Sequence, residues 1–305
     1  MMKNVLILFF LGILFSCGNI APKHEYNIIY EFENDDNISV SKKQSTVEVL
    51  KRRIDKFASN YDVKLNDKQQ IEIILSTDFK LNVVNAIVTN PGKLEFWECI
   101  KVEQLDYSFF SSLSEMMQER NELSSNILDK FSPPVSGGLL SVDIKDAEKI
   151  KDMLKRKEVL ELLPHDIRKS KFLFGNAYNG KADLYLVKLP PSGNAFLNET
   201  HITDARQNYS STGRPTVSMQ MNEIGAQRWE RMTQIAFQER SQIAVTLNDI
   251  VYSAPTASNG AILGGNTEIS GNFTVNEAQD LALILSSRQR IPKLKFVNSL
   301  AIVDE

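Results

Sequence analysis

The sequence predicts an α+β fold whose first region places two helices on one antiparallel sheet. Two segments repeat apolar residues at three- and four-residue steps, as helices with one buried face do. Short segments of alternating or clustered apolar residues flank them, as strands do. The strands are expected at residues 26–32, 61–65, 71–75 and 94–100, and the apolar helix faces contain Val47, Leu50, Ile54 and Phe57, then Leu81, Val84, Ile87 and Val88. The resulting order over residues 26–100, β-α-β-β-α-β, is the split βαβ or ferredoxin-like arrangement.

Turn and cap residues mark the ends of these elements. Residues 66–68 (Asn-Asp-Lys) are expected to join the second and third strands, and residues 90–92 (Asn-Pro-Gly) to end the second helix. Asp78 stands where the N-cap of that helix is expected, because a short polar side chain there accepts a hydrogen bond from the first helical turn.

The character of the sequence changes after about residue 101. A helical stretch over 103–131, an amphipathic helix over 144–157 and two strands at 172–174 and 183–187 are expected in a part that looks irregular and mobile. The last third is more regular, with N-caps at Asn222 and Thr274. Its expected elements are strands at 214–222, 243–247, 251–253 and 269–273, a helix from Asn222 to about 239, a helix after Thr274, and a final strand at 293–303 that can return to the first sheet.

Composition limits the classes of function. Of the 305 residues, 42% are hydrophobic and 24% are charged, which is typical of a folded globular protein and excludes a largely disordered chain. The formal charge is −3 and no motif that reads DNA or RNA is present, so nucleic acid is not an expected partner.

The sequence also lacks the patterns on which enzymes rely. His24, His165 and His201 do not stand at metal-ligand spacing with another histidine, a cysteine or an acidic pair. The glycine-rich segment 260–271 lacks the context of a dinucleotide or phosphate loop, and we expect it to form hairpin turns. No catalytic residue, metal or cofactor is therefore predicted.

The N-terminus has the pattern of an export signal. Lys3 precedes an apolar run at residues 5–15, which is shorter than the ~20 residues of a membrane-spanning helix. Ser16 directly precedes Cys17, an order that resembles the bacterial lipobox, in which the signal is cleaved before the cysteine and the thiol is acylated. An ordinary signal peptide that happens to contain a cysteine is the alternative.

These features predict a lipoprotein of the cell envelope. Residues 1–16 would be the signal peptide, Cys17 the site of lipidation and residues 17–25 a tether. The acyl chains would hold the chain on a membrane with the folded part facing the periplasm. The residues after Cys17 contain no acidic run, so the sequence does not decide between the inner and the outer membrane.

Several motifs follow one another along the chain and resemble those of one family. They are Arg53-Ile54-Asp55-Lys56-Phe57, Pro91-Gly92-Lys93-Leu94-Glu95-Phe96, Arg214-Pro215-Thr216-Val217-Ser218-Met219, Asn222-Glu223-Ile224-Gly225-Ala226, Gln242-Ile243-Ala244-Val245, Val251-Tyr252-Ser253-Ala254-Pro255, Gly264-Gly265-Asn266-Thr267-Glu268-Ile269-Ser270-Gly271-Asn272-Phe273-Thr274 and Glu277-Ala278-Gln279-Asp280-Leu281-Ala282. The chain resembles the first periplasmic domain of SecD, a subunit of the bacterial SecDF protein-export complex. The similarity spans about residues 45–297 and is strongest over 214–292.

The resemblance implies a ferredoxin-like base with a larger inserted α+β head. The base would comprise residues 26–100 and 291–305, and the head residues 101–290. In the family this domain lies at the exit side of the translocation channel, where the head is thought to swing relative to the base while holding the emerging polypeptide. SecD continues into a membrane bundle, whereas this chain ends at Glu305, so we expect it to lack an energy source of its own.

Two functions follow as hypotheses. The first is a lipid-anchored protein that binds exported or unfolded polypeptides at the trans side of the channel. The second is a structural adaptor that docks on SecDF, another component of the Sec translocon or another envelope complex. A hydrolase or transferase on the same scaffold is a third possibility for which the sequence offers no site.

One group of apolar residues is a candidate polypeptide contact. Flexible methionine and aromatic surfaces suit promiscuous binding of unfolded chains. The spacing is also that of an amphipathic helix packed on its own domain, which remains the alternative. The group consists of Phe109, Phe110, Leu113, Met116 and Met117, with Phe172 and Phe174.

Overall fold

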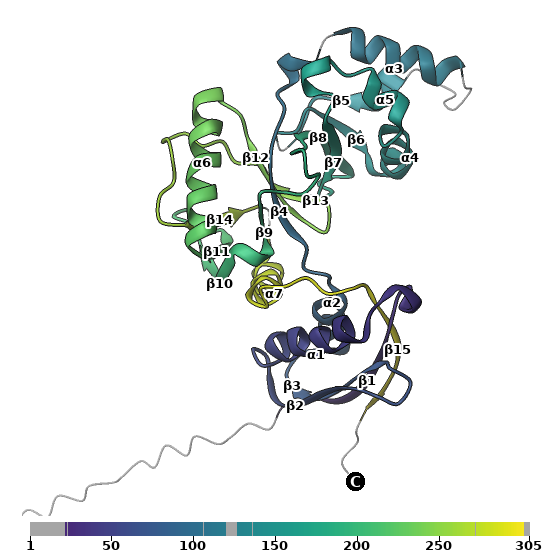
Figure 1. Ribbon diagram of the computed structural model, residues 1–305, viewed down its shortest axis with the longest axis vertical. Coiled ribbons are helices and arrows are strands. Elements are labelled where there is room, and N and C mark those ends of the chain that lie inside the picture. Colours follow the sequence, from purple (N-terminus) through teal and green to yellow (C-terminus); the bar gives the residue numbers. More distant parts are fainter. Residues whose placement is uncertain are drawn as a thin grey trace, which may run out of the picture.

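The computed structural model describes residues 22, 24–105, 107–119, 127–135, 137–271 and 273–301 (Figure 1). The expected signal peptide and Cys17 lie outside the described residues. The described residues form three sheets. One of these sheets lies at one end of the molecule together with the two helices that follow its first and third strands in the chain (Figure 1).

The sheet at this end is the expected ferredoxin-like one. Its strand order is β15-β1-β3-β2, and all neighbouring strands are antiparallel. The elements are β1 (His24–Phe32), α1 (Val40–Ile54), β2 (Ala58–Leu65), β3 (Ile71–Thr77), α2 (Leu81–Thr89) and β15 (Leu294–Ala301). Leu50 and Ile54 of α1 and Val84 of α2 share one core with Ile28 and Ile73 of the sheet, so the predicted apolar stripes do face it.

One strand predicted for this sheet belongs to another. The sequence pattern places a strand at 94–100 as the last member of the ferredoxin-like unit, but β4 (Leu94–Glu98) lies in the eight-stranded sheet described below. Phe96 and Trp97 point into two different cores, as expected of a strand that is covered on both faces. The place next to β1 is taken by β15, which confirms that the final strand returns to the first sheet.

The largest sheet has eight strands in the order β5-β6-β8-β7-β13-β12-β4-β9. Its neighbouring strands are antiparallel except for the parallel pair β7 and β13. Besides β4, the strands are β5 (Phe131–Ser132), β6 (Leu140–Asp143), β7 (Ser170–Gly175), β8 (Lys181–Lys188), β9 (Leu197–Asn198), β12 (Ile243–Leu247) and β13 (Ile250–Ser253).

Three helices pack on the β6-β8-β7 end of this sheet. They are α3 (Tyr107–Glu119), α4 (Ile144–Leu154) and α5 (Lys157–Glu161). The expectation of irregular structure after residue 101 is therefore wrong for the described part of this region. Several of its strands have only two to four residues, too few to show an alternating pattern.

The third sheet has the order β10-β11-β14 and is antiparallel. Its strands are β10 (Ile202–Tyr209), β11 (Pro215–Met221) and β14 (Asn266–Ser270), and its helices are α6 (Glu223–Glu239) and α7 (Val275–Ser286). The strand expected at 269–273 thus begins and ends earlier. Trp229 of α6 and Leu281 of α7 share a core with Val217 of β11. In Figure 1, α7 lies between this sheet and the ferredoxin-like unit.

Two of the three predicted N-caps are confirmed. Asn222 Oδ1 accepts a hydrogen bond from the Gly225 amide at 2.8 Å, and Thr274 forms a reciprocal capping box with Glu277. Asp78 is not a cap, because α2 begins later and Lys80 occupies the N-cap position. The turn after β3 is held instead by the Thr77 hydroxyl, which accepts from the Phe79 amide at 3.2 Å.

Removal of the capping hydroxyl of α7 gives the first testable prediction. In the Thr274→Ala variant the Glu277 amide loses its acceptor, and we expect the free energy of unfolding to fall by about 1 kcal/mol in urea denaturation. Thr274→Ser keeps the hydroxyl and should retain most of the stability. An alanine variant as stable as the parent would show that the cap contributes nothing to α7.

Candidate functional site

A cleft of about 970 Å³ lies where the eight-stranded sheet, the three-stranded sheet and the ferredoxin-like unit meet. One side is formed by the end of β7 and by β13. The other side is formed by the β10–β11 turn and the ends of β11 and β14. Four residues of α7 and two from the C-terminal part of α2, Ala86 and the C-cap Asn90, also line it, together with residues of β8, of β12 and of the segment that follows β7. The volume is at the upper end of the range for sites that hold a small ligand.

Aromatic side chains line part of the cleft. Tyr252 of β13 stacks on Phe273, with ring centroids 6.0 Å apart. Tyr178 is 44% exposed and also faces the cleft. Burial and the charge of Glu277 raise the pKa of Tyr252, so its phenol stays protonated at neutral pH. Rings of this kind provide apolar contact area and a polar edge for a ligand.

Strand edges also border the cleft. The parallel pairing of β7 with β13 includes only Ile250 and Val251 of β13. One more backbone hydrogen bond follows it, from the Asn176 amide to the Val251 carbonyl at 3.1 Å. Within the described residues β14 pairs with β11 alone, and its last residue, Ser270, lines the cleft. Backbone groups at such edges can accept an added extended segment.

Two hydroxyl groups at the cleft have no hydrogen-bond partner among the described residues. They are Thr216 Oγ1 and Ser253 Oγ, both buried at the atomic level. A buried polar group without a partner is uncommon, and it destabilises a protein by roughly 1–3 kcal/mol. The lining therefore contains two hydroxyl groups that lack a hydrogen bond within the described residues.

The charged groups of the cleft are mostly acidic. Asp183, Glu277 and Asp280 line it, and Arg214 is the basic residue among the described lining residues. Asp183 accepts hydrogen bonds from the Val135 amide at 2.9 Å, the Gly138 amide at 3.3 Å and the Ser141 hydroxyl, and this carboxylate therefore holds the adjacent loop.

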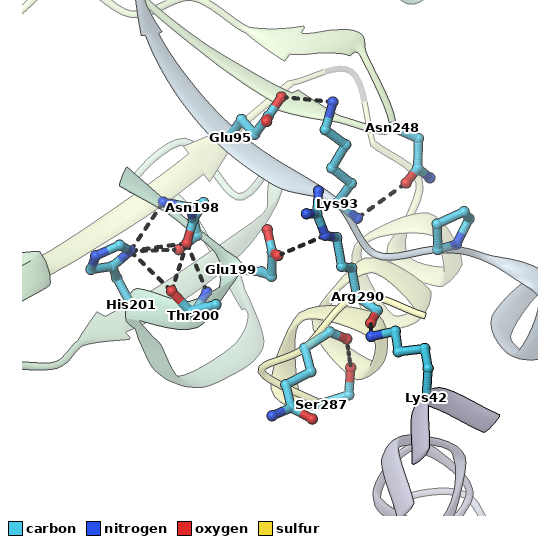
Figure 2. Close-up of polar contacts among 12 residues, drawn as sticks. Lys42, Lys93, Glu95, Asn198, Glu199, Thr200, His201, Asn248, Ser287 and Arg290 are labelled. Carbon is cyan, nitrogen blue, oxygen red and sulfur yellow. Dashed lines mark hydrogen bonds and ion pairs between the residues drawn. The ribbon is translucent and has the colours of Figure 1, made fainter. Parts of the chain in front are cut away.

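A polar network lies at the junction between α1 and the part of the chain that carries the eight-stranded and three-stranded sheets (Figure 2). Lys42 of α1 donates to the carbonyl of Arg290 at 3.3 Å, and the Arg290 side chain lies 3.8 Å from the Glu199 carboxylate. Burial raises the pKa of Glu199. Lys93 pairs with Glu95 at 3.2 Å. The contacts of Arg290 with Lys42 and Glu199 connect the ferredoxin-like unit to the rest of the chain beside α7.

The structure places the candidate contact residues away from this cleft. Phe109 and Leu113 of α3 and Phe174 of β7 are buried in one core, and their contact with a polypeptide stays a prediction. Phe110, Met116 and Phe172 are partly buried against the same core, and their contact with a polypeptide stays a prediction. Met117 lies on α3, but its side chain is outside the described residues.

Ring contacts explain this packing. The Phe109 ring lies 5.2 Å from that of Phe110 and 6.1 Å from that of Phe172, and Phe110 in turn contacts Phe131 at 6.5 Å. The aromatic residues that the sequence singles out are thus used mainly to attach α3 to the sheet. Sequence reasoning missed the cleft because its lining comes from segments far apart in the chain, although several of its residues lie in the SecD-like motifs.

Two kinds of feature are absent from the described residues. No cluster of three or more histidine, cysteine, aspartate or glutamate side chains that could hold a metal ion occurs there. None of the described helices has both the length and the apolar character needed to cross a membrane.

Comparison with known proteins identifies relatives. Residues 175–288 match the family model for the SecDF P1 head subdomain. A protein translocase subunit SecD of Rhodothermus marinus is 32% identical over 186 residues, which cover 58% of this chain and 29% of that protein. A protein translocase subunit SecDF of Thermus thermophilus is 34% identical over 117 residues, which cover 38% of this chain and 16% of that protein. The chain therefore spans less than a third of the length of these relatives.

Solved structures show the same fold. SecDF in its super-membrane-facing form aligns with 91% of this chain and 30% of the SecDF chain, with a TM-score of 0.56 and 19% identity. A second structure, from a study of SecDF as a membrane component that enhances protein export, aligns with 89% of this chain and 98% of its own, with a TM-score of 0.51 and 19% identity. The matched head region contains most of the cleft lining. This chain is thus similar to SecD over more than half of its length and shares the fold of the aligned part of SecDF, and residues 175–288 match the SecDF P1 head subdomain.

Proposed function

We propose that this chain takes part in protein export by binding exported or unfolded polypeptides in the cleft, at the trans side of the translocation channel. The relation to SecD supports the general role, because the relatives are named as translocase subunits. Binding would be driven by contact with the polypeptide alone, without catalysis and without an energy source in this chain.

The cleft is the observation that carries this proposal. It combines a large volume, aromatic rings and the edge of β14, which has no second partner strand among the described residues, all within or next to the region that matches the SecDF head. Backbone pairing at a strand edge does not depend on the side chains of the added segment, so it suits a protein that must accept many sequences. The rings of Tyr252 and Phe273 would add apolar contact area.

The remaining features of the expected protein are part of the same proposal. We place the base at residues 26–100 and 291–305 with β4 contributed to the head sheet, the head at residues 101–290, and the chain in the periplasm on a lipid attached to Cys17 after removal of residues 1–16. A lipid anchor would keep the cleft close to a membrane across which polypeptides emerge.

A photo-crosslinking experiment in the cells that produce the protein tests the proposal. A photoreactive amino acid at position 178 should give a heterogeneous smear of adducts, because Tyr178 is exposed in the cleft and would meet many different chains. The smear should vanish when secretion is blocked. The matched control is Phe237 of α6, which has a similar exposure, 43% against 44%, and does not line the cleft.

The outcomes separate the two hypotheses. Equal smears from positions 178 and 237 would contradict a role of the cleft. A single sharp adduct that persists without secretion would instead support an adaptor.

One surface favours the adaptor as the second candidate. Leu263 is 67% exposed and Ile224 57% exposed, and the loop that carries Leu263 is attached to α6 by a hydrogen bond from the Ile262 amide to Thr233 at 2.9 Å. Exposed apolar residues of this kind mark docking surfaces when they cluster. A photoreactive residue at position 263 would then give one defined adduct, whose identity would name the complex.

A further inference from the structure

We propose that the cleft prefers extended polypeptide segments that carry a lysine or arginine side chain, and that Asp280 of α7 receives this cation. The inference rests on the proposed function, because it specifies which polypeptide segments the cleft would bind. It is supported by the placement of charges in the lining and by polar groups there that have no hydrogen-bond partner among the described residues.

Asp280 is distinct among the carboxylates of the cleft. No hydrogen bond or ion pair joins it to another described residue, and it is half-buried. Glu277, one turn earlier on α7, is held by the amide and hydroxyl of Thr274 at 2.8 and 3.0 Å, and Asp183 is held by two backbone amides and Ser141. Asp280 is therefore the carboxylate of the described lining that is available to a ligand.

The surroundings of Asp280 favour the arrival of a positive charge. Burial and the neighbouring charge of Glu277 both disfavour its ionised form and raise its pKa. A cation brought by a ligand would interact favourably with both carboxylates and make a charge-assisted hydrogen bond with Asp280. Arg214, the basic residue of the described lining, is exposed and therefore screened by solvent.

Other groups of the lining fit the rest of such a segment. Thr216 is fully buried, yet its hydroxyl at the cleft has no partner among the described residues, and the hydroxyl of Ser253 is in the same situation. A bound backbone has amides and carbonyls that can satisfy such groups after a small movement of the lining. The stacked rings of Tyr252 and Phe273 can receive the aliphatic part of a lysine or arginine side chain.

A peptide-binding experiment on the full chain tests the inference. Three short unstructured peptides would be identical except for one central residue, which is lysine, glutamine or glutamate, and binding would be measured by fluorescence anisotropy at low ionic strength. We expect the lysine peptide to bind about fivefold to tenfold more tightly than the glutamine peptide, as for one partly exposed charge-assisted contact, and the glutamate peptide to bind most weakly.

Two variants assign the preference to its residue. Asp280→Asn should reduce the difference between the lysine and glutamine peptides to less than about twofold, since the amide has the same shape without the charge. Asp280 has no partner in the described structure, so this change should leave the fold intact, which circular dichroism would verify. Asp67→Asn, in an exposed turn of the ferredoxin-like unit, removes the same charge away from the cleft and should leave the preference unchanged.

The results distinguish this inference from the proposed function. If the lysine and glutamine peptides bind equally to the parent protein, or if the preference survives in Asp280→Asn, the charge preference is overturned while polypeptide binding stands. If none of the three peptides binds, both are overturned.

Discussion

Replacement of Arg53 by methionine is expected to lower the free energy of unfolding by about 3–5 kcal/mol. Arg53 of α1 is completely buried. Its guanidinium donates to the Ser287 hydroxyl at 3.2 Å and to the carbonyls of Ile87 at 3.0 Å, Asn90 at 2.5 Å and Pro91 at 3.4 Å. Methionine would leave these acceptors without a donor in a buried junction.

The surroundings of the buried Arg53 charge explain why loss of its guanidinium should destabilise the fold. Among the described residues no carboxylate pairs with it. The carbonyls of Ile87 and Asn90 lie at the C-terminal end of α2, where the helix dipole is negative, and they take the place of a counterion. Burial and the neighbouring Arg52 lower the pKa of Arg53 to about 9, so it remains charged at neutral pH.

Urea denaturation followed by circular dichroism measures the effect, and the neighbouring arginine provides the control. Arg52 is exposed and bonds to Ser287 and Gln289, so Arg52→Met should cost less than about 1 kcal/mol. Arg53→Lys should lie between the two, because an ammonium group cannot reach all four acceptors. Equal losses in Arg52→Met and Arg53→Met would contradict a special role of the buried side chain.

The second large effect is expected for Gly92→Ala, at about 2–4 kcal/mol. Gly92 has a φ of +74°, which disfavours any residue with a Cβ. An added Cβ would also lie 2.7 Å from Nη2 of Arg53 and 3.2 Å from Cγ2 of Ile284. The substitution therefore combines backbone strain with displacement of the guanidinium from its acceptors.

A second glycine separates these two contributions. Gly213 has a φ of +75°, but a Cβ there meets nothing within 4 Å, so Gly213→Ala should cost only the backbone term of about 1 kcal/mol. The excess loss in Gly92→Ala measures the contact with Arg53 and Ile284. In an Arg53→Met background that excess should shrink, because contacting residues are coupled in a double-mutant cycle. Equal losses at the two glycines would contradict the contact.

Local signals in the sequence predict local structure well. The side chains of Asn222 and Thr274 stand where a helix needs an acceptor, and both are caps. Asp78 has the same chemistry, but Thr77 holds the turn and the helix begins later. A cap residue thus indicates that a helix is near, whereas its first residue is decided by competing hydrogen bonds in the turn.

Patterns of burial do not identify the partner of a buried face. The segment at 94–98 is correctly predicted as a strand, yet its pattern does not distinguish the sheet that contains β1 from the one that contains β12. Likewise the stripe of Phe109 and Leu113 identifies one apolar face of α3 but not whether its own sheet or a bound polypeptide covers that face. The cleft escapes prediction for the same reason, because it depends on which distant segments come together.

The return of β15 to the first sheet has a consequence for the order of folding. β1, β2 and β3 come first along the chain, but the strand that completes their sheet, β15, is the last one described. Until it arrives, one edge of β1 remains open, and pairing between segments so distant in sequence is slow. The two ends of the intervening region meet at a hydrogen bond from the Ile291 amide to the Pro91 carbonyl, at 2.9 Å. Once that region has folded, β15 lies near β1 and pairs with it at little further cost in chain entropy. We therefore expect the sheet whose strands come first in the chain to be the last to be completed.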